Sequence, residues 1–165
     1  MNQNIPKQHL DLARHNENAC NFLKEDNTFP DWVITTAFYA ALHYVSSVIF
    51  PYECLQQGKK KLVNDVAAYK NSIGSHDNKH KLMMDLVFYK CKNIGKSYSA
   101  LLELSYSSRY DTNLPDTLYS NRAQKYLADI KSHCEKVHTP TTARIITARP
   151  EMLSEALSSD NVEEA

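Results

Sequence analysis

The sequence predicts an all-α protein, a bundle of four to five helices followed by a C-terminal tail. Three observations favour this fold class. Apolar residues recur at helical spacing through most of the chain, glycine occurs only three times, and no strand-like alternation is found outside the tail. A chain of 165 residues is about one domain. We therefore expect a helical domain over residues 1–138 and a tail over residues 139–165 that is partly disordered or partner-binding.

The composition narrows the functional classes. Lys+Arg and Asp+Glu both total 19, so the net charge gives no general attraction to nucleic acid or to an anionic membrane. The four cysteines are scattered without a CxxC pair, as expected for free thiols in a reducing compartment. The N-terminus lacks the apolar stretch of a signal peptide, and polar residues interrupt the apolar run Trp32–Pro51. We expect a cytoplasmic protein with no membrane association.

The first two helices have the clearest patterns. Residues 5–26 are amphipathic, with apolar side chains at helical spacing. Pro30 suits the first turn of a second helix that runs to about Phe50, and Pro51 ends it. The apolar side of the second helix, expected to face the core, is formed by Val33, Ile34, Ala37, Phe38, Ala40, Ala41, Val45, Val48 and Ile49.

A second stripe of side chains runs along the same helix. At about 100° per residue, Trp32, Thr36, Tyr39, His43 and Ser47 fall within about 60° of each other. Two interpretations are open. The stripe packs against a neighbouring helix, or it lines a groove or a self-association surface, where Trp and Tyr are enriched.

The middle of the chain gives a weaker pattern. Residues 52–74 contain a basic run, Lys59–Lys61, and a short helix is expected around Leu62–Tyr69. Ser75 is a candidate N-cap for a helix from His76 to about Lys92.

Two further helices are predicted in the C-terminal half. Gly95 separates the preceding helix from one over roughly Lys96–Tyr110, and a loop over Asp111–Pro115 follows. The last helix spans Asp116–Val137, whose apolar positions follow a helical stripe. In the tail, the segment TARIITA is apolar enough to add to an edge or groove of a partner.

The segment SHDNKHK, residues 75–81, contains candidate binding residues. His76 and His80 lie one turn apart in the expected helix, a spacing seen for metal ligands. The adjacent Asp77 points elsewhere on that helix, so no metal site is predicted. Lys79, His80 and Lys81 instead give a cationic helical face that either meets a phosphate or is solvated.

The segment SYSSRYD, residues 105–111, places Arg109 near a helix C-terminus, where the helix dipole favours a cation. Two interpretations are open here as well. Arg109 is a structural charge with Tyr110 closing the core, or it is aimed at a phosphate or a carboxylate. The chain has no GxSxG, HExxH, P-loop or GxGxxG motif, and no cofactor is predicted.

The order of these segments resembles the HEPN superfamily (higher eukaryotes and prokaryotes nucleotide-binding), in particular small stand-alone bacterial and archaeal members. A first helix ending in NFLKED is followed by DWVITTAFYAALHYV, then SHDNK, then YSALLELSYSSRY. The resemblance covers roughly residues 8–137, is strongest over Asp31–Tyr44 and does not include the tail. It implies a HEPN-like bundle of four or five helices, commonly a homodimer with a cleft at the interface.

The resemblance also implies a chemistry. Many members of the superfamily are metal-independent ribonucleases with an RxxxxH-type motif, in which histidine handles protons and arginine stabilises phosphate charge. None of the five arginines of this chain has a histidine at that spacing, and Lys79 stands where an SHxxR-like segment has arginine. The positions that match recurrent polar residues of the subgroup are His43, His76, Lys79 and Arg109.

Three functional hypotheses follow. The first is a HEPN-like dimeric binding module for a nucleotide, an RNA or a protein partner. The alternative is a divergent metal-independent ribonuclease of a toxin or defence system, with His43, His76 and Arg109 as candidate catalytic residues. A third is a partner-dependent module whose tail, residues 139–165, folds on another protein. The expected binding residues are Tyr39, His43, His76, Lys79, His80, Arg109 and Tyr110.

Overall fold

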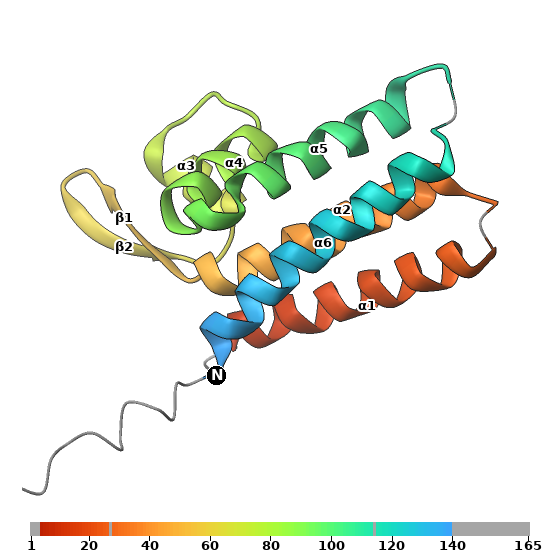
Figure 1. Cartoon of the computed structure of the whole chain (residues 1–165). Helices are drawn as coiled ribbons and strands as arrows, with labels where there is room; N and C mark the ends of the chain where they lie inside the picture. Colours follow the sequence, from red (N-terminus) through yellow and green to blue (C-terminus); the bar gives the residue numbers. More distant parts are fainter. Residues whose placement is uncertain (1–3, 27, 114, 140–165) are drawn as a thin grey trace, which may run out of the picture.

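The computed structural model describes residues 4–26, 28–113 and 115–139, which form a helical bundle (Figure 1). These residues contain six α-helices, one short 3-10 helix and one two-stranded hairpin. The four longest helices, α1 (Ile5–Asp26), α2 (Pro30–Ile49), α5 (Gly95–Tyr110) and α6 (Thr117–His138), pack side by side. The all-α bundle predicted from the sequence is confirmed.

Helix α2 lies at the centre of the bundle. It packs against α1, α5 and α6, and its predicted core face is buried except for the half-buried Val48. Among the described helices, α2 is the one long and apolar enough to cross a membrane by length and composition. However, 67% of the apolar 18-residue stretch of α2 is buried inside the protein. Packing within the bundle therefore accounts for the apolar composition of this helix.

The polar stripe of α2 does not form one continuous surface. Trp32 and Tyr39 are exposed, Thr36 and His43 are half-buried, and Ser47 is buried. The stripe therefore changes along the helix from a surface that faces solvent to one that packs against other elements.

Two hydroxyl groups of this stripe donate to backbone carbonyls of α2 itself. Thr36 Oγ1 donates to the carbonyl of Trp32 (2.7 Å), and Ser47 Oγ donates to the carbonyl of Tyr44 (2.7 Å). Ser47 Oγ also lies 2.9 Å from Nε2 of His138, at the end of α6. This contact fastens the C-terminal ends of α2 and α6 to each other.

A β-hairpin that the sequence did not predict follows α2, and its second strand includes the first two residues of the short helix predicted over Leu62–Tyr69. Strands β1 (Tyr52–Gln56) and β2 (Lys59–Val63) pair antiparallel. Gln57 and Gly58 connect them with φ values of 50° and 75°, the backbone that a tight two-residue hairpin turn requires. Glycine tolerates this conformation without strain. The hairpin projects from the bundle at the end where α2 finishes (Figure 1).

Helix α3 (Val66–Ile73) starts directly after the hairpin. The carboxylate of Asp65 caps it by accepting a hydrogen bond from the N–H of Ala68 (2.8 Å). The ring of Tyr69 meets the ring of Tyr52 edge-on, with centroids 5.4 Å apart. The helix that the sequence predicts in this region therefore exists, but it begins four residues later and packs on the hairpin.

Helix α4 (Lys79–Lys90) is shorter than the predicted helix His76–Lys92. Asn78, and not Ser75, is its N-cap, because the Asn78 side chain accepts the backbone N–H three residues on (2.8 Å). Ser75 Oγ instead accepts the N–H two residues on (3.1 Å). His76 therefore precedes the helix and does not lie one helical turn from His80.

The last two helices agree with the prediction to within a residue or two. A 3-10 turn over Lys92–Ile94 leads into α5, whose first residue is Gly95. A Cβ atom at Gly95 would lie only 2.6 Å from the Phe88 ring, so a larger residue at this position requires the ring to shift. Asp116 caps α6, its carboxylate accepting two backbone N–H groups. The predicted tail, residues 139–165, lies outside the described residues from position 140 onward.

All four cysteines are free, as predicted, and all four are buried. Burial raises the pKa of the Cys20 and Cys91 thiols, and it raises the pKa of Cys134 to about 12. A thiol in such surroundings is a poor nucleophile and a poor metal ligand. These cysteines are therefore core residues.

Candidate functional site

The C-terminal part of α5 brings a guanidinium group against two tyrosine rings. Tyr106, Arg109 and Tyr110 lie at helical positions i, i+3 and i+4, where side chains are neighbours. The guanidinium carbon of Arg109 is 5.4 Å from the ring centroid of Tyr106 and 5.4 Å from that of Tyr110. The two rings are themselves 6.0 Å apart, tilted by 30°. This geometry is that of a cation stacked on aromatic rings.

His80 joins these residues from the first turn of α4. Its ring centroid lies 5.8 Å from that of Tyr106, nearly edge-on, and 5.6 Å from that of Phe38 on α2. Three helices thus contribute to one group of side chains. We call Phe38, His80, Tyr106, Arg109 and Tyr110 the Arg109 cluster.

The hydrogen-bonding capacity of Arg109 is only partly used. Its Nε donates to the carbonyl of Ser105 (2.8 Å), which holds the side chain along α5. Its Nη2 is buried without a hydrogen-bond partner, and no carboxylate of the described residues lies within ion-pair distance. A buried donor without an acceptor costs about 1–3 kcal/mol, and more when it is charged. An acceptor from outside the chain would reach this nitrogen only after a side-chain movement that uncovers it.

Unsatisfied polar groups are concentrated on α5. Among the described residues, four buried side-chain polar groups have no hydrogen-bond partner: Ser72, Tyr98, Ser105 and Arg109. Three of the four belong to α5. The fully buried Tyr98 lies 6.1 Å from the Phe38 ring, and burial, followed by the nearby Tyr106, raises its pKa. The protein interior behind the Arg109 cluster therefore contains donors as well as apolar side chains.

His80 is biased toward its neutral form. Its pKa is lowered, mainly by burial and also by the positive charge of Arg109. A neutral imidazole can accept a proton, and a guanidinium stabilises negative charge on a phosphate. The cluster can therefore bind an anion, stack on an aromatic group and accept a proton.

The structure brings together three of the predicted binding residues, namely His80, Arg109 and Tyr110. Tyr39 and Lys79 are exposed and lie next to cluster members in the sequence; the rings of Tyr39 and Phe38 are 5.7 Å apart. The interpretation that Tyr110 closes the core is wrong, because this side chain is 72% exposed. It is available for contact with a ligand.

His43 lies in different surroundings. Its Nδ1 is 3.1 Å from Nδ1 of His9 on α1, and the two ring centroids are 5.3 Å apart. Burial is the main cause that lowers the pKa of both histidines. His76 is exposed in the connection before α4. The candidate catalytic residues His43, His76 and Arg109 therefore do not share one group of contacts.

Three residues in these groups were not among the predicted site residues. Tyr106 carries a local signal, since it stands three positions before Arg109 in a predicted helix. Phe38 was predicted only as a core residue, and it is fully buried. His9 pairs with a residue 34 positions away, and no local spacing predicts such a contact.

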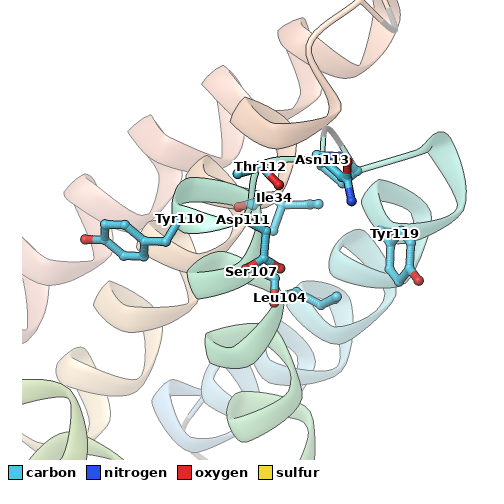
Figure 2. A pocket seen from close by; sticks show the side chains of 10 residues that line it. Ile34, Leu104, Ser107, Tyr110, Asp111, Thr112, Asn113 and Tyr119 are labelled. Carbon is cyan, nitrogen blue, oxygen red and sulfur yellow. The ribbon is translucent and has the colours of Figure 1, made fainter.

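A pocket of about 570 Å³ opens beside α5, between the N-terminal part of α2, the α5–α6 loop and the start of α6 (Figure 2). It is lined by Ile34, Leu104, Ser107, Ser108, Tyr110, Asp111, Thr112, Asn113, Pro115 and Tyr119. The ring of Tyr110 points away from the other labelled side chains, and Tyr119 stands on the opposite side of the pocket (Figure 2). At about 100° per residue, Leu104, Ser107 and Asp111 lie on a different side of α5 from Arg109.

Among the described residues, no group of three or more His, Cys, Asp or Glu side chains is arranged to hold a metal ion. The Arg109 cluster itself offers an imidazole, a guanidinium and aromatic rings. Comparison with protein-family models, curated protein sequences and solved structures found no match to this chain.

Proposed function

We propose that this chain is a HEPN-like binding module for a phosphate-bearing ligand, a nucleotide or an RNA, which it holds at the Arg109 cluster. The observation that carries the proposal is the guanidinium of Arg109, which lies over two tyrosine rings and has no ion-pair partner among the described residues. A planar guanidinium suits bidentate hydrogen bonding to phosphate oxygens. Tyr110 is 72% and Tyr106 38% exposed, so both rings can stack on a base.

The zero net charge of the chain predicts how the affinity for the ligand depends on salt. The net charge is zero, so attraction to a phosphate must be local to the cluster. In such a site, one or two phosphates are neutralised, and log affinity falls with log salt with a slope of about −1 to −2. A steeper slope would indicate a broad basic surface instead.

The test is binding of a fluorescently labelled single-stranded RNA, followed by anisotropy and competed with nucleotides. Arg109→Gln removes the guanidinium, and we expect about a tenfold or larger loss of affinity, as for a charge-assisted bidentate contact. Arg122→Gln is the matched control, because Arg122 also stacks on a tyrosine, 5.8 Å from the Tyr119 ring. Equal weakening in both variants, or no binding by the wild type, would contradict the proposal.

The proposal includes self-association. The α1–α2 and α5–α6 connections lie at the same end of the bundle (Figure 1). Large apolar side chains are exposed on the helix ends and loops next to these connections in the sequence, namely Phe22, Phe29, Trp32, Tyr110, Leu118 and Tyr119. Trp and Tyr exposed in this way are typical of interfaces. Light scattering after size exclusion is expected to give a dimer at micromolar concentration. A strict monomer would count against this part of the proposal.

A ribonuclease is the second candidate, and the His80–Arg109 pair favours it. A neutral imidazole at His80 can take the proton of a 2′-hydroxyl while Arg109 stabilises the charge that develops on the phosphate. Purified protein should then cleave RNA, and His80→Ala and Arg109→Ala should each abolish cleavage. His43→Ala serves as the control, because His43 contacts His9. Cleavage that persists in both cluster variants would exclude this site.

A further inference from the structure

We infer that the pocket between α2, the α5–α6 loop and α6 is a binding site for a small organic cation with an apolar body, such as an arylalkyl amine. This site shares Tyr110 with the Arg109 cluster but contains none of its other members, and it does not rest on the proposed function. Its volume of about 570 Å³ lies within the range of small-ligand pockets, roughly 300–1,000 Å³.

The polar side of the pocket offers acceptors. Helix α5 ends at Tyr110, so the last backbone carbonyls of the helix and the negative end of its dipole are directed toward this region. Asp111 follows immediately, and no cation of the described residues lies within ion-pair distance of its carboxylate. Ser107 and Asn113 add neutral oxygens. Such a lining favours a positive charge or N–H donors and disfavours a phosphate.

The other side of the pocket is apolar. Ile34 is fully buried beneath it, Leu104 is half-buried, and Tyr119 is 42% exposed. Figure 2 shows Ile34, Leu104 and Asp111 gathered between Tyr110 and Tyr119. A flat apolar body can therefore cover the aliphatic side chains while its cationic group reaches Asp111.

The two sides of α5 separate ligands by charge. Arg109 is held away from the pocket by its hydrogen bond to Ser105, and the ring of Tyr110, on which it stacks, points away from the pocket (Figure 2). Arg122 stacks on Tyr119 at the α6 border, 5.8 Å from the ring centroid. The carboxylate of Asp111 is thus left to a ligand.

Three indole compounds test this inference with the full chain, since they share one apolar body and differ in charge. Tryptamine is cationic, tryptophol is neutral and indole-3-acetate is anionic at pH 7. Dissociation constants from NMR titration should rank them in that order. Tryptamine should bind about five- to tenfold more tightly than tryptophol, as expected for a partly exposed charge pair. Equal binding of the amine and the acetate, or no binding of any indole, overturns the inference.

Substitutions in the full chain test whether the preference for tryptamine over tryptophol arises at this pocket. Asp111→Asn should lower the affinity for tryptamine to that for tryptophol and leave tryptophol unchanged. Glu103→Gln is the matched control, because it removes the same charge from an exposed position on α5 outside the pocket lining. An equal loss of tryptamine affinity in Asp111→Asn and Glu103→Gln would overturn the assignment of Asp111 as the partner of the cation. The ranking of the three compounds is measured on the wild type, so this test does not depend on whether a variant folds.

Discussion

The Nδ1 atoms of His9 and His43 lie 3.1 Å apart and connect α1 to α2. In a hydrogen bond between two imidazoles, one ring nitrogen donates and the other accepts, so the pair is satisfied when both rings are neutral. Burial lowers the pKa of both, and the proximity of His9 lowers that of His43 further. The backbone of Asn64 and the charge of Asp65 act in the opposite direction on His9.

We predict that acid destabilises the fold through this pair. The unfolded histidines have a pKa near 6.5, and the folded pKa values lie below it, so the unfolded state binds more protons in this range. Stability is fully present above about pH 7 and is lost as the pH falls through 6.5 toward the folded values.

Thermal unfolding followed between pH 7.5 and 5 measures this effect. A His9→Gln/His43→Gln double variant should lose part of the pH dependence that the wild type shows. His76→Gln is the control, because His76 is exposed, and it should follow the wild-type curve. Identical pH slopes in all three proteins would show that the pair does not titrate with unfolding.

Gly95→Ala should destabilise the protein by about 1–3 kcal/mol, as expected for overpacking. The added methyl group would meet the Phe88 ring at 2.6 Å, between α4 and α5. Urea unfolding gives the change in free energy. Phe88→Leu in the same chain should relieve part of the penalty, and an unchanged free energy in Gly95→Ala alone would show that the ring moves aside without loss.

A buried tyrosine should be stabilised by a carboxylate. Tyr44 OH donates to Glu17 Oε2 at 2.7 Å, and Lys131 Nζ donates to Glu17 Oε1 at 2.8 Å. Tyr44→Phe removes a hydrogen bond to a charged group and should cost about 1.5–3 kcal/mol in urea unfolding. Tyr89→Phe, at an exposed position, should change the free energy little. A double cycle with Glu17→Gln should show that the two effects are coupled.

Ligand binding at the Arg109 cluster should strengthen as the pH falls. His80 has a lowered pKa in the free protein, mainly through burial and then through Arg109. A bound phosphate would favour the protonated imidazole and raise that pKa, so binding takes up a proton. RNA affinity measured from pH 8 to 5.5 should rise toward acid in the wild type and become flatter in His80→Ala. A rise of equal size in both proteins would exclude His80 as its cause.

The sequence predicts the long helices well because their boundaries have local causes. Pro30 and Pro51 bracket α2, and the observed helix runs from Pro30 to Ile49. The hairpin was missed because its strands have only five residues each and because lysines on β2 obscure the apolar alternation. Its one local signal is Gln57-Gly58, which supplies the two positive φ values of the turn.

The candidate site was predictable only where its residues share a helix. Arg109 and Tyr110 lie one after the other at the end of a correctly predicted helix. The contact of His80 with Tyr106 depends on how α4 and α5 pack, which spacing within one helix does not encode. The start of α4 was not predictable from the spacing either. Asn78 caps this helix, so His76 precedes it and the one-turn spacing between His76 and His80 does not exist.

The contact between Ser47 and His138 also determines where the rest of the chain departs. Helix α6 has 22 residues and is therefore about 33 Å long, with its two ends at opposite ends of the bundle (Figure 1). The C-terminal end of α6 thus lies beside the C-terminal end of α2, where the hairpin begins, and at the opposite end of the bundle from the α5–α6 connection (Figure 1). Because Arg109 and Tyr110 lie at the C-terminal end of α5, the last described residues of the chain and the Arg109 cluster belong to opposite ends of the bundle.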